Sequence, residues 1–242
     1  MLKEISSVFS FLTIIPTNNA NLETIAKYMY LFPIVGIVIG LVVGGFGYGL
    51  SYIGLEPLVI GLLVMGSIAL ITGIHHTDGL ADFADGLMAK GTKEKKLQAM
   101  KDLSTGSAGI VTVVLYIIGM IIALSLFEGY LLFQAILVSE IMAKFSMVLM
   151  ASTGQSAALG TNSPFVQLMK DKKKLAASIA LTIIPLVIVA GSTGMIVFAA
   201  GVIVTLFLVG LSTRSFGGIT GDVLGASNEF TRLTSLLIFV TI

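Results

Sequence analysis

Apolar residues form long uninterrupted runs along most of this chain, and short polar connections separate the runs. A helix needs roughly 17–25 apolar residues to cross a hydrocarbon core of about 30 Å. A final apolar piece, 230–242, is short for a full crossing. The pattern predicts an all-α, polytopic membrane helix bundle of about six to seven transmembrane helices, built as one integral membrane domain over residues 1–242. The predicted spans are 29–54, 57–74, 108–127, 130–150, 174–190 and 194–213.

The N-terminal segment has a different pattern. Its charge is mixed at Lys3 and Glu4, its apolar run is short, and no small-residue cleavage site follows. These features argue against a signal peptide. Helical spacing instead predicts an interfacial helix that lies on the membrane surface and is ended by Pro16. Its apolar positions are Ile5, Val8, Phe9, Leu12 and Ile15.

Composition supports the same class. Hydrophobic residues make up 56% of the sequence and charged residues 11%, and the mean hydropathy is +1.02. Soluble domains carry about 25% charged residues, so the lipid bilayer is an expected partner. A net charge of +1, without a basic stripe interleaved with aromatics, predicts no nucleic-acid partner. The absence of cysteine excludes disulfides and thiolate metal sites.

Lysine and arginine residues concentrate in alternate connections. The connections at 55–57, 128–129 and 191–193 contain neither residue type. Because cytoplasmic loops carry the excess of basic residues, the basic connections are predicted to face the cytoplasm. This places a multi-pass protein in the cytoplasmic membrane. Its cytoplasmic segments would be a long loop at 75–107 with candidate catalytic residues, a polar segment at 151–173, and a Gly-rich loop at 214–229.

Three aspartates, Asp78, Asp82 and Asp85, begin the long loop. At about 100° per helical residue, their spacing places all three carboxylates within an arc of roughly 60°. Like charges on one helical face repel each other, and a bound hard cation such as Mg²⁺ would remove that repulsion. A solvated acidic face is the simpler alternative. The paired Asp-Gly steps, and a position beside the membrane in a chain with few acids, favour a metal site.

Two other segments are rich in small residues. Residues 104–109 lead into the third span, where N–H groups at a helix N-terminus would suit an anion. Such a run is also typical of an ordinary loop. Residues 217–226 contain one acid, Asp222, and are either a bare turn or a backbone cradle for phosphate or metal.

Glu140 and Lys144 place two charges inside the fourth predicted span. Their spacing and order favour an ion pair along the helix, and intramembrane charges usually face a cavity or a functional site. The Lys144 amine is near enough to the cytoplasmic end to snorkel toward that surface. Both a structural and a functional pair fit. His75 and His76, beside the aspartates, are either interfacial residues or ligands.

Several motifs, in order along the whole chain, resemble those of a known family. Residues 72–86, Thr-Gly-Ile-His-His-Thr-Asp-Gly-Leu-Ala-Asp-Phe-Ala-Asp-Gly, are similar to the signature of the cobalamin 5′-phosphate synthase family, also called adenosylcobinamide-GDP ribazoletransferase. The blocks at 32–36, 100–109 and 217–226 fit as well. The chain departs from the pattern at Lys101 and Lys144, where an Arg is expected; Lys keeps the charge but loses the bidentate fork.

This resemblance implies a membrane transferase in the last steps of cobalamin assembly. Such an enzyme joins adenosylcobinamide-GDP to alpha-ribazole or its 5′-phosphate, releases GMP and uses Mg²⁺. Carboxylates that hold divalent cations suit this diphosphate chemistry. The resemblance implies metal ligation by Asp78, Asp82 and Asp85 with Asp222 or Asp102, catalytic roles for Asp85 as proton acceptor and for Asp82, Lys101 and Lys144, and substrate binding by His76, Gly106, Gly109, Gly218, Thr220 and Gly221.

Two rival functions differ in testable ways. A CDP-alcohol phosphotransferase also uses spaced aspartates, but its Asp-Gly-x-x-Ala-Arg run is absent and residues 82–90 end in Lys with the wrong spacing. A cation transporter usually binds its ion at the bilayer midplane on broken helices, whereas these aspartates follow the second span. The sequence leaves open the phosphorylation state of the ribazole, the preferred base and a homo-oligomer.

Overall fold

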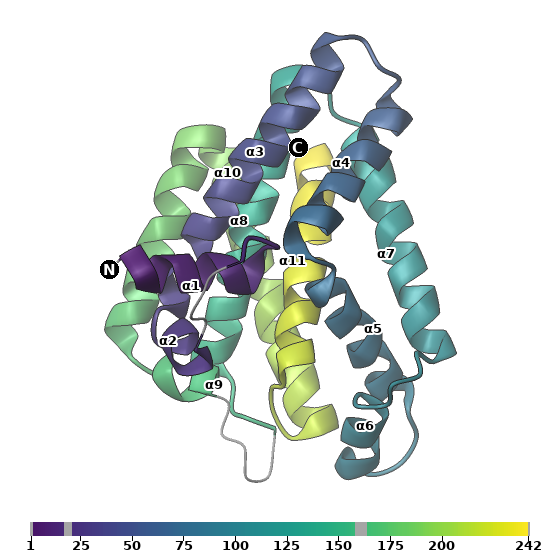
Figure 1. Ribbon diagram of the computed structural model, residues 1–242, viewed down its shortest axis with the longest axis vertical. Coiled ribbons are helices and arrows are strands. Elements are labelled where there is room, and N and C mark those ends of the chain that lie inside the picture. The colour runs from purple at the N-terminus through teal and green to yellow at the C-terminus, as the bar shows by residue number, and fades with distance from the viewer. Residues whose placement is uncertain (1, 17–20, 158–163, 242) are drawn as a thin grey trace.

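The computed structural model describes residues 2–16, 21–157 and 164–241, and over these ranges the protein is built from helices (Figure 1). The described residues form no strand; a single isolated bridge joins Ser156 to Ile219. The elements are α1 (Leu2–Leu12), α2 (Leu22–Lys27), a 3-10 turn η1 (Met29–Leu31), α3 (Phe32–Tyr52), α4 (Pro57–Thr72), α5 (His75–Met88), α6 (Lys93–Ala99), α7 (Ser107–Ser125), α8 (Gly129–Thr153), α9 (Pro164–Leu168), α10 (Lys172–Phe216) and α11 (Gly221–Thr241).

Helices long and apolar enough to cross a membrane dominate the described residues. Four pass on length and composition, and a fifth is added if α4 and α5, which meet at a 93° bend, count as one span. Large apolar side chains such as Leu62, Leu115 and Phe207 stay exposed on the outer faces of these helices. Faces of this kind suit hydrocarbon rather than water. The predicted all-α membrane bundle is confirmed at this level.

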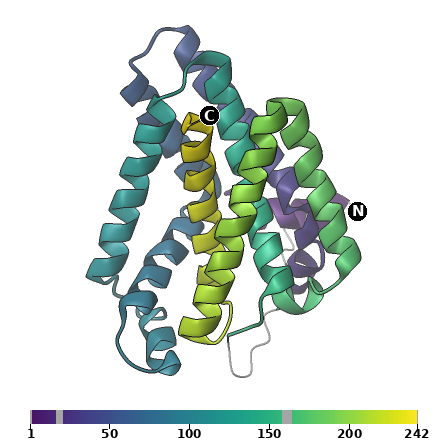
Figure 2. The ribbon, with the colours of Figure 1, turned by 180° about the vertical axis from the view of Figure 1, so that it is seen from behind.

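The two spans predicted at 174–190 and 194–213 form one broken element, α10. Its backbone leaves helical geometry at Gly191, with φ 53° and ψ −125°, a conformation that favours glycine. The chain folds back there into two adjacent arms (Figure 2). The close approach of the arms explains Gly194, because a Cβ there would lie 2.4 Å from the carbonyl oxygen of Leu186.

The last helix is longer than its hydropathy predicts. The Gly-rich loop expected at 214–229 is mostly helical, because α10 runs to Phe216 and α11 starts at Gly221. Only residues 217–220 connect the two. The apolar run begins at Phe230, but the polar residues before it are buried inside the bundle, so the helix extends well beyond the run.

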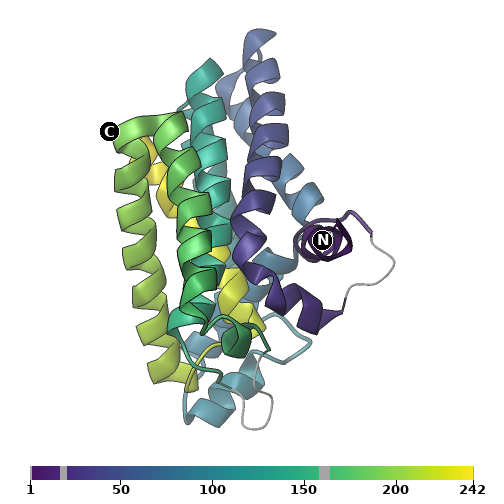
Figure 3. The same cartoon turned by 90° about the vertical axis from the view of Figure 1, so that its left-hand side faces the viewer.

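The predicted interfacial helix corresponds to α1, which ends at Leu12 rather than at Pro16. Figure 3 views α1 along its own axis, and it lies across the direction of the long helices. Val8 and Leu12 are buried against the bundle. At the centre stands α8, which packs against α3, α10 and α11 and is buried along most of its length.

Candidate active site

A sharp bend between α4 and α5 positions the predicted aspartates. Gly73 ends α4 in the left-handed conformation, with φ 68°. Ile74 follows with φ 65°, and it is the single non-glycine residue of the described chain with positive φ. A β-branched residue in that region is strained. The bend turns α5 out of the line of α4 and lays it against α7 and α11.

Glycines allow α5 and α11 to cross at close range. A Cβ on Gly79 would lie 3.1 Å from both the Cα and the carbonyl oxygen of Asp222. A Cβ on Gly225 would lie 3.2 Å from the carbonyl oxygen of His76. Side chains at these positions would push the helices apart. The crossing therefore brings Asp222, from the C-terminal block, next to the aspartate helix.

The carboxylates at this crossing interact electrostatically. Burial, followed in order of size by the neighbouring charges of Asp222, Asp78 and Asp85, raises the pKa of Asp82 to about 6. Burial also raises the pKa of Asp222, with Asp78 contributing, while Thr220 and Lys101 oppose the rise. Crowded carboxylates that resist ionisation favour a cation partner. Carboxylates from both α5 and α11 therefore contribute to the negative charge at the crossing.

The carboxylate side chains at the crossing are suitable ligands for a hard cation, although their oxygens do not converge on one position. Carboxylate oxygens are the ligands that Mg²⁺ prefers. Among the described residues, however, no three His, Asp or Glu side chains converge closely enough to hold an ion as they stand. Asp78, Asp82 and Asp222 would have to rotate toward a common centre.

Asp85 has a different set of partners. Its two carboxylate oxygens accept hydrogen bonds from the N–H groups of Gly106, at 2.7 Å, and Gly109, at 2.9 Å. Gly106 is the N-cap residue of α7. A Cβ on Gly106 would lie 2.4 Å from one oxygen of Asp85, and a Cβ on Gly109 would lie 2.6 Å from the other. The anion at this helix N-terminus is thus supplied by the protein itself.

The other predicted residues are divided between the site and its surroundings. Lys101 is close enough to Asp222 for its positive charge to lower the pKa of that carboxyl. Asp102 is exposed and accepts the N–H of Ser104 at 3.0 Å. Thr220 immediately precedes α11, and its hydroxyl contacts Asp222 and the N–H of Val223, each at 3.3 Å. Gly218 packs against backbone, since a Cβ there would lie 2.4 Å from the carbonyl oxygen of Gln155. Gly221 has open space beside it.

Glu140 and Lys144 are not paired along α8. Glu140 accepts from Arg232, with the Nε–Oε1 distance 2.6 Å. Lys144 is 0% exposed and donates to Asn228 Oδ1 at 2.8 Å. The predicted i,i+4 pair and the snorkelling of Lys144 are both absent from this arrangement, because α11 offers partners at the same depth.

These contacts belong to a larger polar network between α7, α8 and α11. Arg232 also donates to Glu229 and, at 3.0 Å, to the Tyr116 hydroxyl. Tyr116 in turn donates to Glu229, and Asn228 donates to Glu229 at 3.0 Å. Two acids and two bases balance, which is what burial of charge requires. None of Asn228, Glu229 and Arg232 was predicted as a site residue from the sequence; the i,i+4 spacing of Asn228 and the i,i+3 spacing of Glu229 to Arg232 were the available signal.

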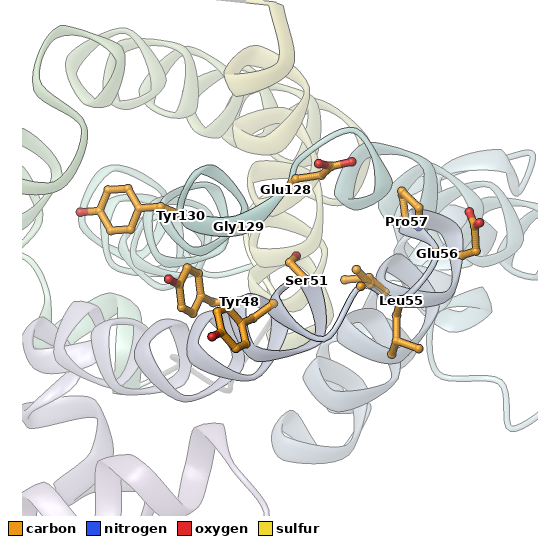
Figure 4. Close-up of a pocket in the computed structure, with 11 residues that line it drawn as sticks. Tyr48, Ser51, Leu55, Glu56, Pro57, Glu128, Gly129 and Tyr130 are labelled. Carbon is orange, nitrogen blue, oxygen red and sulfur yellow. The ribbon is translucent and has the colours of Figure 1, made fainter.

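A cavity of about 660 Å³ lies away from the aspartates, between the α3–α4 connection and the start of α8 (Figure 4). Tyr48, Ser51 and Tyr130 line it together with Glu56 and Glu128. It contains none of the motif residues, so it is not the candidate active site.

Comparison with known proteins decides the family. The model of the cobalamin-5-phosphate synthase family matches residues 4–240. The chain belongs to this family. The cobalamin-5-phosphate synthase match covers both blocks that meet at the α5–α11 crossing. A comparison with solved structures finds no match.

Curated relatives of this cobalamin-5-phosphate synthase family member carry one name, adenosylcobinamide-GDP ribazoletransferase. The protein of Methanocella arvoryzae is 34% identical over 98% of this chain and 94% of its own length. That of Archaeoglobus fulgidus is 33% identical over 98% and 96%, and that of Pyrococcus abyssi 32% over 96% and 95%. The similarity therefore extends over the full length of each relative rather than over a shared fragment.

Proposed function

We propose that this protein is an adenosylcobinamide-GDP ribazoletransferase acting in cobalamin biosynthesis. It joins adenosylcobinamide-GDP to alpha-ribazole or alpha-ribazole 5′-phosphate and releases GMP. A free ribose hydroxyl of the acceptor, distinct from the 5′ position that carries the phosphate of alpha-ribazole 5′-phosphate, forms a bond to the phosphorus on the corrinoid side. The bond between that phosphorus and the bridging oxygen of the diphosphate breaks, and GMP leaves with the bridging oxygen and the electron pair. The attacking hydroxyl gives up its proton. Family membership and the names of the relatives support this reaction.

The observation that carries the proposal is the α5–α11 crossing, which sets Asp222 beside the aspartate helix. We assign metal binding to Asp78, Asp82 and Asp222: the charges of Asp222 and Asp78 contribute to the raised pKa of Asp82, and the charge of Asp78 contributes to the raised pKa of Asp222. Mg²⁺ bound there would neutralise the diphosphate oxygens as the leaving group departs. Asp85 is engaged by two backbone amides, so we assign it a positioning role instead of the metal and proton-transfer roles that the resemblance implies.

A large cytoplasmic cavity provides space for the donor. It has a volume of about 1180 Å³, lies between α6 and the α10–α11 connection, and is lined by Lys93, Lys101, Ser104 and Thr220 among others. The two lysines would attract a diphosphate. Because Lys101 also acts on Asp222, this cavity is adjacent to the proposed metal site. Lys144 is too deeply buried to take part directly.

The membrane arrangement is part of the same proposal. The two arms of α10 and the central α11 each cross the bilayer, in addition to α3, α4, α7 and α8. The basic connections 75–107, 151–173 and 217–220 then face the cytoplasm, where the nucleotide-linked donor is available. The one-sided distribution of lysine and arginine supports this orientation.

Measurement of GMP release in nanodiscs tests the function. Purified protein is given adenosylcobinamide-GDP with and without alpha-ribazole, and with Mg²⁺ or a chelator. We expect GMP only when both substrates and Mg²⁺ are present, and none from Asp82→Asn, which should insert and purify normally. CMP release from a CDP-alcohol, or Mg²⁺ uptake by proteoliposomes without GMP release, would favour one of the rival functions. Full turnover by Asp82→Asn would remove this carboxylate from the metal site.

A further inference from the structure

A second cavity opens on the other side of the α5–α11 crossing. Its volume is about 480 Å³, and it is enclosed by α1, α2 and α9 on one side and by α5, α8 and α11 on the other. Phe11 and Phe165 form part of its wall, with ring centroids 5.4 Å apart and an interplanar angle of 29°. Ile25 and Met147 add apolar surface, and Asp222 lines it as well. The cavity therefore shares one carboxylate with the proposed metal site.

One buried polar atom of this cavity has no partner. His76 lines the cavity and is 6% exposed. Its Nδ1 is buried and forms no hydrogen bond within the described part of the chain. Buried polar atoms are nearly always paired, so an unpaired one beside a cavity indicates a missing ligand atom.

The residues that line this cavity indicate which class of ligand it can bind. The described residues of the lining include no Lys or Arg, so they offer no counter-charge to a phosphate or a diphosphate. An unpaired imidazole nitrogen beside aromatic rings suits a planar, uncharged heteroaromatic group with a ring nitrogen. A volume of about 480 Å³ lies in the range of small-molecule sites and suits a nucleoside better than a corrinoid macrocycle. Gly221 leaves this wall open, since a Cβ there would meet no atom within 4 Å.

We infer that this cavity binds the aromatic base of the acceptor nucleoside, with His76 hydrogen-bonded to a base nitrogen and the reacting ribose hydroxyl directed toward Asp222. The inference rests on the proposed function and adds a separate acceptor subsite to it. The donor then approaches from the large cytoplasmic cavity near Lys101, and the acceptor approaches from the opposite side of the crossing. The two substrates meet at the carboxylates.

Equilibrium binding of alpha-ribazole tests the inference without turnover. The protein has no tryptophan, so the fluorescence of the ligand's own base can be followed directly, in the absence of Mg²⁺ and donor. Phe165→Ala removes one aromatic wall, and Gly221→Leu fills the cavity. We expect each to weaken alpha-ribazole binding at least about tenfold and to raise its KM similarly, with the KM of adenosylcobinamide-GDP within about twofold of wild type.

Matched controls separate the cavity from general damage. Phe46→Ala removes an exposed ring on α3, and Gly210→Leu adds the same side chain at a glycine of α10 that also has open space. Both should bind alpha-ribazole like the wild type. His76→Phe should lose affinity, and His76→Asn, which keeps a polar atom close to the Nδ1 position, should recover part of it.

Three outcomes would overturn the inference. Wild-type alpha-ribazole affinity in both Phe165→Ala and Gly221→Leu would show that the base binds elsewhere. Equal losses in Gly221→Leu and Gly210→Leu would show a non-specific effect. Phospholipid retained by wild type but lost from Gly221→Leu in native mass spectrometry, with nucleoside binding unchanged, would make this a lipid site. Wild-type GMP release, measured in the same preparation, keeps a failure of the subsite distinct from a failure of the proposed function.

Discussion

Substitution of Asp85 should loosen the start of α7 before it affects anything else. Asp85→Ala removes both acceptors of the Gly106 and Gly109 N–H groups. Loss of an N-cap side chain costs about 0.5–2 kcal/mol, and loss of a negative charge near a helix N-terminus costs about 0.3–1 kcal/mol more. The opening free energy of this turn should therefore fall by about 1–3 kcal/mol, which corresponds to amide exchange that is roughly 5- to 150-fold faster.

Hydrogen–deuterium exchange in nanodiscs, followed by mass spectrometry of peptides covering 104–112, measures this change. Asp85→Asn keeps one acceptor oxygen but turns an NH₂ group toward the second amide, so its effect should be intermediate. Gly109→Ala should resemble Asp85→Ala, because its Cβ would lie 2.6 Å from an Asp85 oxygen and 3.0 Å from the Ala81 carbonyl oxygen. Asp102→Ala is the control, since Asp102 accepts the N–H of Ser104 in the loop that precedes α7.

Unchanged amide exchange at 104–112 in Asp85→Ala would show that Asp85 does not hold the start of α7. If GMP release were lost under those conditions, Asp85 would be acting directly on metal or substrate, as the resemblance implies. If exchange rises and activity falls together in Asp85→Ala and in Gly109→Ala, the residue acts by positioning the loop that carries Lys101.

Three further predictions concern the carboxylates and the membrane orientation. Asp222→Ala should reduce turnover and Mg²⁺ affinity together, and a Cys pair at positions 82 and 222 should cross-link with a short reagent; failure to cross-link in folded protein would contradict the shared site. The pKa of Asp82 is raised to about 6, so metal-free protein should be more stable near pH 4 and lose that contribution as the pH rises through about 6; thermal unfolding of Asp82→Asn should lack this step. Mg²⁺ binding, which needs the ionised carboxylate, should strengthen over the same interval. Ser104→Cys and Ser156→Cys should resist labelling from outside intact cells, and clear labelling of either would reverse the orientation.

The apolar spans were predictable because lipid selects for them directly. The starts and ends of α4, α7 and α8 lie within a few residues of the predicted ones, since hydrocarbon thickness fixes the length of each run. The start of α11 was not predictable in this way. Asn228, Glu229 and Arg232 interrupt its apolar pattern, and only their partners on α7 and α8 explain how they are buried.

The candidate site was predictable as a set of residues but not as an arrangement. Helical spacing placed Asp78, Asp82 and Asp85 on one face, and that inference treated them as equivalent. It held no information about the α7 amides that bind Asp85, because that contact depends on the turn of the chain at Gly73 and Ile74. The proximity of Asp222 to Asp82 likewise depends on the glycines at the helix crossing.

The buried network around Arg232 has a consequence for biogenesis. The α11 segment does not pass as a membrane span on length and composition, and an unpaired Arg at a helix centre opposes insertion by about 2.5–3.5 kcal/mol. Its partners, Tyr116 and Glu140, are synthesised first, on helices that do pass. We therefore expect the last helix to enter the bilayer by docking onto α7 and α8 rather than alone. A chain that lacks Glu140 should then leave the ribosome with its C-terminal segment stranded at the membrane surface, exposed to quality-control proteases.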